Sequence, residues 1–182
     1  MTLSEIADTN LHLAARRAYE IGRLEGALWR GAVAALFALP GFLVCNENPL
    51  AALCLAGFAL VVVAGRVRGG AWEDGTRAGA IAGVAPCLLP AALRTLDPNL
   101  CATLMTGVPW PCAVGGLVAG AILALRGRPA AGLPFWASAL AALSFAAAIG
   151  CIPAGAMGFA GLLLGVIAGG APVLVATRLR GI

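Results

Sequence analysis

The sequence has very little charge. It contains no lysine and a single histidine, and only 11% of its residues are charged, against about 25% in an ordinary soluble domain. Hydrophobic residues make up 61% of the chain, and the mean hydropathy is +0.95. This composition excludes a soluble globular protein and indicates a polytopic membrane protein whose surface is solvated by lipid.

Long uncharged stretches predict the transmembrane helices. The stretch 129–177 must hold two of them, because about 20 residues cross the hydrocarbon core and a Gly-Cys-Ile-Pro-Ala-Gly turn interrupts it at 150–155. We therefore predict an all-α bundle of six transmembrane helices over 27–177, preceded by an amphipathic tail at 1–26 and followed by a tail at 178–182. The predicted helices are 27–45, 49–65, 78–96, 108–125, 132–150 and 154–177. We expect no cleavable signal peptide, because Glu5 and Asp8 follow the first Met.

The arginines predict the orientation. Eleven of the twelve fall on one side of the predicted bundle, and only Arg94 approaches the other side. The positive-inside tendency then places both termini in the cytoplasm. The Arg- and Ala-rich composition suggests a GC-rich bacterial genome, so we expect the chain in a bacterial inner membrane. We expect no direct nucleic-acid binding, since the arginines of the tail alternate with Glu20 and Glu25 and lack aromatic stacking partners. The eleven are Arg16, Arg17, Arg23, Arg30, Arg66, Arg68, Arg77, Arg126, Arg128, Arg178 and Arg180.

Small residues recur at helix spacing in three of the predicted helices. Such stripes let helix backbones approach closely in lipid, where hydrophobic association is weak. We expect the helices at 78–96, 108–125 and 154–177 to pack most closely, although the same stripes suit a homo-oligomer or a contact within a larger membrane complex. The stripes are Gly79 with Gly83, Gly116 with Gly120, and Gly161 with Gly165 and Gly169.

The sequence offers no catalytic constellation. We place every Asp and Glu in a tail or a loop, and Ser138 and Ser144 have no base at a matching depth. We therefore predict a non-enzymatic protein without a cofactor. Pro86 and Pro172 leave a different class open, a small transporter or channel subunit, because broken helices at matched positions are typical of many transporters.

Four cysteines are predicted to lie on the outer side of the membrane, where an oxidising compartment favours disulfides. Their spacing does not determine the connectivity. A redox switch, a soft-metal site and plain packing at helix ends remain alternatives. The soft-metal site is the weakest, because His, Met and carboxylate partners are missing. The disulfide candidates are Cys45, Cys101, Cys112 and Cys151.

The segment 4–30 has the pattern of an amphipathic helix running into the first transmembrane helix. Ser4 can cap it, and Glu5 and Asp8 suit its positive end. Its apolar stripe needs a cover, which the lipid headgroups, the bundle itself or a soluble partner can provide. The stripe comprises Leu11, Ala14, Ala18, Ile21 and Leu28. The candidate partner-binding residues are Leu11, Arg16, Arg17, Ile21 and Leu24.

Three segments in the last third carry a resemblance to a known family. They are Arg126-Gly127-Arg128-Pro129, Gly150-Cys151-Ile152-Pro153 and the closing Arg178-Leu179-Arg180. With the overall plan of a tail and six helices, they resemble the membrane anti-sigma regulators of the NrsF type. The resemblance implies that the tail holds a sigma factor at the membrane until a signal releases it, and that Cys151 has a structural role.

Overall fold

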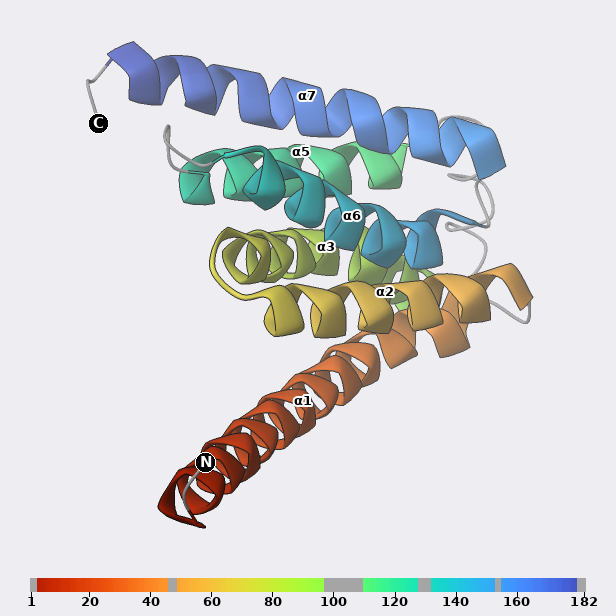
Figure 1. The fold of residues 1–182 in the computed structure, drawn as a ribbon. Coiled ribbons are helices and arrows are strands. Elements are labelled where there is room, and N and C mark those ends of the chain that lie inside the picture. Colours follow the sequence, from red (N-terminus) through yellow and green to blue (C-terminus); the bar gives the residue numbers. More distant parts are fainter. Residues whose placement is uncertain (1–2, 46–48, 97–109, 128–131, 153–154, 180–182) are drawn as a thin grey trace.

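The computed structural model describes residues 3–45, 49–96, 110–127, 132–152 and 155–179 (Figure 1). Within these residues the chain forms six α-helices, which confirms the all-α prediction. They are α1 (Leu3–Cys45), α2 (Pro49–Arg68), α3 (Ala71–Leu96), α5 (Trp110–Arg126), α6 (Leu133–Cys151) and α7 (Gly155–Leu179).

Three of the described helices, α2, α6 and α7, are long and apolar enough to cross a membrane. The apolar helix α5 is shorter, with 17 residues. Length and composition therefore support a membrane protein, while six membrane crossings stay a prediction.

Helices α3 and α6 form the centre of the bundle. Half of the apolar window of α6 is buried, against 17% of that of α2, so α6 is an inner helix and α2 an outer one. Helices α5 and α7 pack against each other on one side of this centre, and α1 and α2 lie on the other side (Figure 1). Two clusters of buried side chains fill the bundle, and both contain residues of α3 and α6.

The glycine stripes lie at interfaces inside the bundle. A Cβ atom added at Gly79 would overlap the carbonyl oxygen of Ala139 in α6, and one at Gly120 would overlap that of Val166 in α7. Gly165 approaches the backbone of α5 in the same way. Helices α3, α5 and α7 thus form close contacts as predicted, and α6 is the partner of α3 that the glycine pattern did not indicate.

The predicted beginning of the third helix, at residue 78, is wrong. Helix α3 begins at Ala71, so Glu73 and Asp74 lie in its first turn and not in a loop. Acidic side chains are favourable there because they face the positive end of the helix dipole. The connection between α2 and α3 therefore consists of Gly69 and Gly70 alone. Their φ angles of 70° and 56° suit glycine.

Pro86 and Pro172 lie inside helices without ending them. Helix α3 continues through Pro86 and α7 through Pro172, each as one helix. The broken helices of many transporters are therefore not formed at these two positions.

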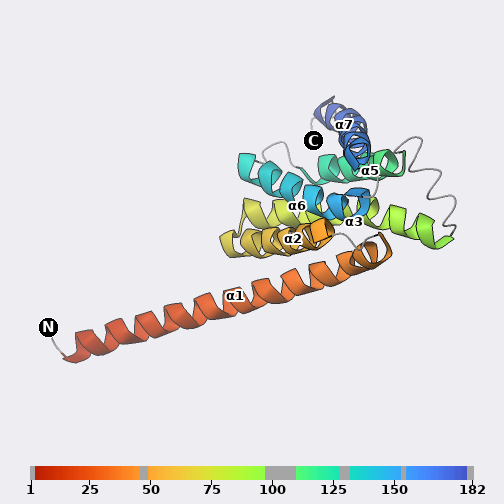
Figure 2. The same cartoon turned by 90° about the vertical axis from the view of Figure 1, so that its right-hand side faces the viewer.

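Helix α1 is a single helix of 43 residues with no interruption between the predicted tail and the predicted first span. At ~1.5 Å per residue it is about 65 Å long, roughly twice the ~30 Å hydrocarbon core of a bilayer. Figure 2 shows its N-terminal half extending past the ends of the other helices. About half of α1 therefore stands outside any membrane that the bundle spans.

Candidate functional site

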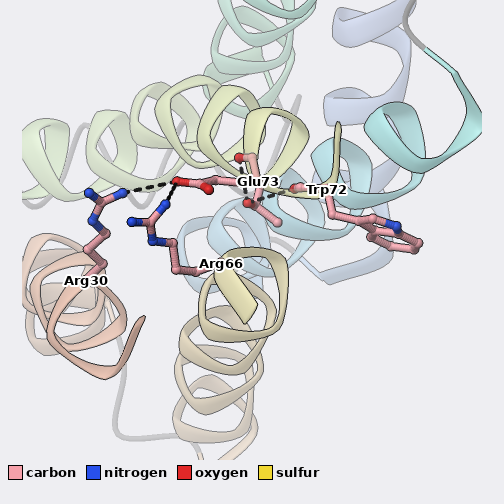
Figure 3. A network of polar contacts seen from close by, with 5 residues as sticks. Arg30, Arg66, Trp72 and Glu73 are labelled. Atoms are coloured by element: carbon pink, nitrogen blue, oxygen red, sulfur yellow. Dashed lines mark hydrogen bonds and ion pairs between the residues drawn. The ribbon is translucent and has the colours of Figure 1, made fainter. Parts of the chain in front are cut away.

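The point where α1 leaves the bundle is held by an ion-pair cluster. Arg30 of α1 and Arg66 at the end of α2 both donate to the carboxylate of Glu73 in the first turn of α3 (Figure 3). The Arg30 Nη1 to Glu73 Oε1 distance is 3.2 Å. One acidic side chain thus joins three helices at the arginine-rich end of the bundle, the end formed by the last turn of α2 and the first turn of α3.

Neighbouring side chains stabilise the helix turn that carries Glu73. The buried hydroxyl of Thr76 is 2.9 Å from the carbonyl oxygen of Glu73 and 3.0 Å from that of Trp72, so it bonds to the backbone of the first turn of α3. The guanidinium of Arg68 lies 4.7 Å from the centre of a Trp72 ring, as in a cation–π contact. Thr76 also fills the space opposite Gly65, because a Cβ there would overlap its side chain.

The cluster carries an excess of positive charge. Arg30 and Arg66 together face the single carboxylate of Glu73, and the guanidinium of Arg23 reaches the turn at Gly69. Arg30 is also more than half exposed. The arrangement therefore leaves positive charge facing the surroundings at the level where α1 leaves the bundle.

Replacing Glu73 by Gln is expected to destabilise the protein modestly. The substitution leaves Arg30 and Arg66 side by side without their shared anion, and partly exposed ion pairs contribute up to about 1 kcal/mol each. We expect the free energy of unfolding, followed by circular dichroism in mixed micelles, to fall by about 1 kcal/mol. The control is Asp74→Asn, which removes an exposed charge from the same helix turn. An equal loss in both variants would contradict a specific role for Glu73.

Apart from the approach of the Arg23 guanidinium to the turn at Gly69, the extended part of α1 does not pack on the part of the bundle that the structure describes. Every described side chain from residue 15 to residue 25 is exposed, and a Cβ added at Gly22 would meet no atom within 4 Å. Docking on the bundle, one of the three covers left open for this stripe, is therefore not seen for its described residues in this part of α1, because α1 continues straight where docking would require it to bend. Lipid headgroups or a soluble partner remain as covers.

The candidate partner-binding residues do not all share one face of α1. Arg17, Ile21 and Leu24 follow one another at spacings of four and three residues, so they lie along one side of the helix. Arg16 lies on another side, where its Nε donates to Glu20 Oε1 at 3.1 Å. The side chain of Leu11 lies outside the described residues. We call Arg17, Ile21 and Leu24 the α1 face.

The structure brings two of the four disulfide candidates together. Cys112, at the start of α5, and Cys151, at the end of α6, are buried side by side and joined by a side-chain hydrogen bond, not by a disulfide. Both side chains are at most 2% exposed. Cys101 and the side chain of Cys45 lie outside the described residues. The sequence alone left this pairing open.

The buried hydroxyl of Ser138 bonds to the backbone of its own helix. It donates to the carbonyl oxygen of Phe135 at 3.0 Å, as a helical serine does when its hydroxyl bonds to its own backbone. Within the part of the chain that the structure describes, no group of three His, Cys, Asp or Glu side chains is placed to hold a metal ion.

Comparisons with known proteins give no relative. No family model, no curated protein and no solved structure is significantly similar to this chain. The function must therefore be argued from the residues themselves.

The sequence interpretation missed the role of Glu73. The available signal was the acidic pair Glu73 and Asp74 between the arginines at positions 66, 68 and 77. The partner Arg30 comes from 43 residues earlier in the chain, and only the packing of α1 against α3 brings the two together.

Proposed function

We propose that this protein is a non-enzymatic membrane anchor that holds a soluble cytoplasmic protein through the extended part of α1. The observation that carries the proposal is the continuity of α1, which is one helix from Leu3 to Cys45 and extends past the bundle with its described side chains at 15–25 exposed. Such a helix presents a ready-formed surface, so a partner binds it without the cost of ordering a disordered tail.

The distribution of charge supports the cytoplasmic side. The extension leaves the bundle beside Arg30, Arg66 and Arg68, and α5 ends at the same end of the bundle with Arg126 (Figure 1). Arginines collect on the cytoplasmic side of membrane proteins. We infer that α1 extends into the cytoplasm of a bacterial cell, that the bundle crosses the inner membrane six times, and that both termini are cytoplasmic.

The character of the α1 face favours a protein over lipid as its cover. To lie on the membrane surface the helix would have to turn sharply where it leaves the bundle, but it is continuous past Arg30, which is fixed to Glu73. The α1 face combines two apolar side chains with Arg17, a composition suited to a groove with an acidic rim. A sigma factor is our first candidate for the partner, from the resemblance to the NrsF-type regulators.

Affinity purification from the native membrane tests this function. We expect a soluble protein to purify with the full-length chain, and Ile21→Asp to reduce its recovery at least tenfold, since a carboxylate in an apolar contact costs more than about 1.4 kcal/mol. The matched control is Tyr19→Asp, because Tyr19 is 69% and Ile21 66% exposed and the two lie on roughly opposite sides of α1. Equal recovery with both variants, or a soluble partner with neither, would contradict the proposal.

A further inference from the structure

An apolar cavity opens between α1 and α3. It has a volume of about 420 Å³. Its walls come from α1 and α3, and its floor includes Phe58 of α2 and Ala146 of α6. On the outer rim Phe37 of α1 and Val84 of α3 are exposed. A cavity this apolar does not retain ordered water, which needs several polar partners.

The length of the cavity matches one leaflet of a bilayer. Its lining runs on α1 from Trp29 to Ala38 and on α3 from Ala80 to Leu88, which is about 12–14 Å along each helix at ~1.5 Å per residue. One leaflet contributes about half of the ~30 Å hydrocarbon core. A single acyl chain that enters from the arginine-rich end therefore fits the length of the cavity.

Charge is present at only one end of the cavity. Among the described residues that line it, Arg30 is the only charged one, and it belongs to the cluster in which Arg30 and Arg66 face the single carboxylate of Glu73. A guanidinium carries five N–H donors, and the half-exposed Arg30 uses one of them on Glu73. Trp29 lies one residue away and is exposed, as is typical of tryptophan at the level of the lipid headgroups.

We propose that the cavity between α1 and α3 binds an anionic phospholipid, with one acyl chain in the apolar part and the phosphate group at Arg30. The excess positive charge of the cluster selects an anionic over a zwitterionic headgroup. The bound chain fills the gap between α1 and α3 where side chains leave it open. This binding does not depend on the α1 face or on a soluble partner.

Native mass spectrometry tests the site. The full chain is placed in nanodiscs of phosphatidylcholine with one tenth phosphatidylglycerol, released, and analysed for the lipid that stays bound. We expect one retained lipid, with phosphatidylglycerol enriched at least fivefold over its share of the bilayer. Retained lipid with the composition of the bilayer would overturn the proposal.

Two variants test the contribution of the acyl chain and that of the headgroup separately. Val84→Trp fills the cavity from α3 and is expected to abolish retention, whereas Val118→Trp, at a similarly exposed position on α5 away from the cavity, is expected to retain the lipid. Arg30→Gln is expected to keep a bound lipid but to lose the fivefold enrichment of phosphatidylglycerol. Arg126→Gln on α5 is expected to keep that enrichment. Unchanged enrichment in Arg30→Gln, or unchanged retention in Val84→Trp, would overturn the proposal.

Discussion

Replacing Gly120 by Leu is expected to break the contact between α5 and α7. A Cβ at this position would overlap the carbonyl oxygen of Val166 and approach the backbone nitrogen of Gly170, so the obstacle is backbone that cannot rotate away. The two helices must separate, and the reciprocal contact of Gly169 with Leu117 in α5 is lost with them. Overpacking a core costs roughly 1–3 kcal/mol, and we place this substitution at or above the upper end because it is backbone that must move.

Unfolding in mixed micelles measures this effect. We expect Gly120→Leu to lower the free energy of unfolding by about 3 kcal/mol, which is a change of more than a hundredfold in the folding equilibrium. The matched control is Gly22→Leu in the extended part of α1, where a Cβ meets nothing within 4 Å. That control should be neutral or slightly stabilising, since leucine favours helix over glycine. A similar loss in both variants would show that the α5–α7 contact is not close.

Mild oxidation is expected to join Cys112 and Cys151 in a disulfide. The two thiols already form a hydrogen bond, so the sulfur atoms need little movement to bond. A membrane-permeant aromatic disulfide serves as the oxidant, because exchange with it takes up two electrons and two protons and releases two aromatic thiols. The product links α5 covalently to α6, with which α5 otherwise shares few contacts.

Peptide mapping after alkylation under denaturing conditions detects this bond. We expect a peptide containing Cys112 to be linked to one containing Cys151 in most of the oxidised protein, while Cys54 and Cys87 are recovered as alkylated thiols. The oxidised protein should also unfold at a higher denaturant concentration, by an amount typical of a loop of about 40 residues, roughly 3–4 kcal/mol in the chain-entropy model. Cys112→Ser is the control and should show no gain. A different cysteine pair in the linked peptides would contradict the assignment.

Hydropathy predicted the helices well where an apolar run ends at a clear break. The second, fifth and sixth predicted helices begin within one residue of α2, α6 and α7, because Pro49, Pro134 and the 150–155 turn mark these starts. The beginning of α3 was missed because Glu73, Asp74 and Arg77 resemble a loop by charge, although acidic side chains stabilise the first turn of a helix.

The sequence did not predict which distant segments contact each other, and the reason is physical. A glycine stripe shows that a helix has a close partner but not which helix it is, and the α6 surface that receives Gly79 and Gly83 is made of alanines such as Ala139 and Ala146. The Cys112–Cys151 pair and the contact of Arg30 with Glu73 likewise depend on how whole helices align across the bundle. Local sequence patterns do not encode that alignment.

Site-specific photocrosslinking in intact cells tests most directly whether α1 holds a soluble partner. A photoreactive phenylalanine analogue replaces Ile21 on the α1 face, and in a matched sample it replaces Leu60, which is equally exposed on α2. We predict that position 21 crosslinks one soluble cytoplasmic protein and that position 60 crosslinks lipid. Lipid products at both positions would show that α1 lies on the membrane and would contradict the proposed anchoring function.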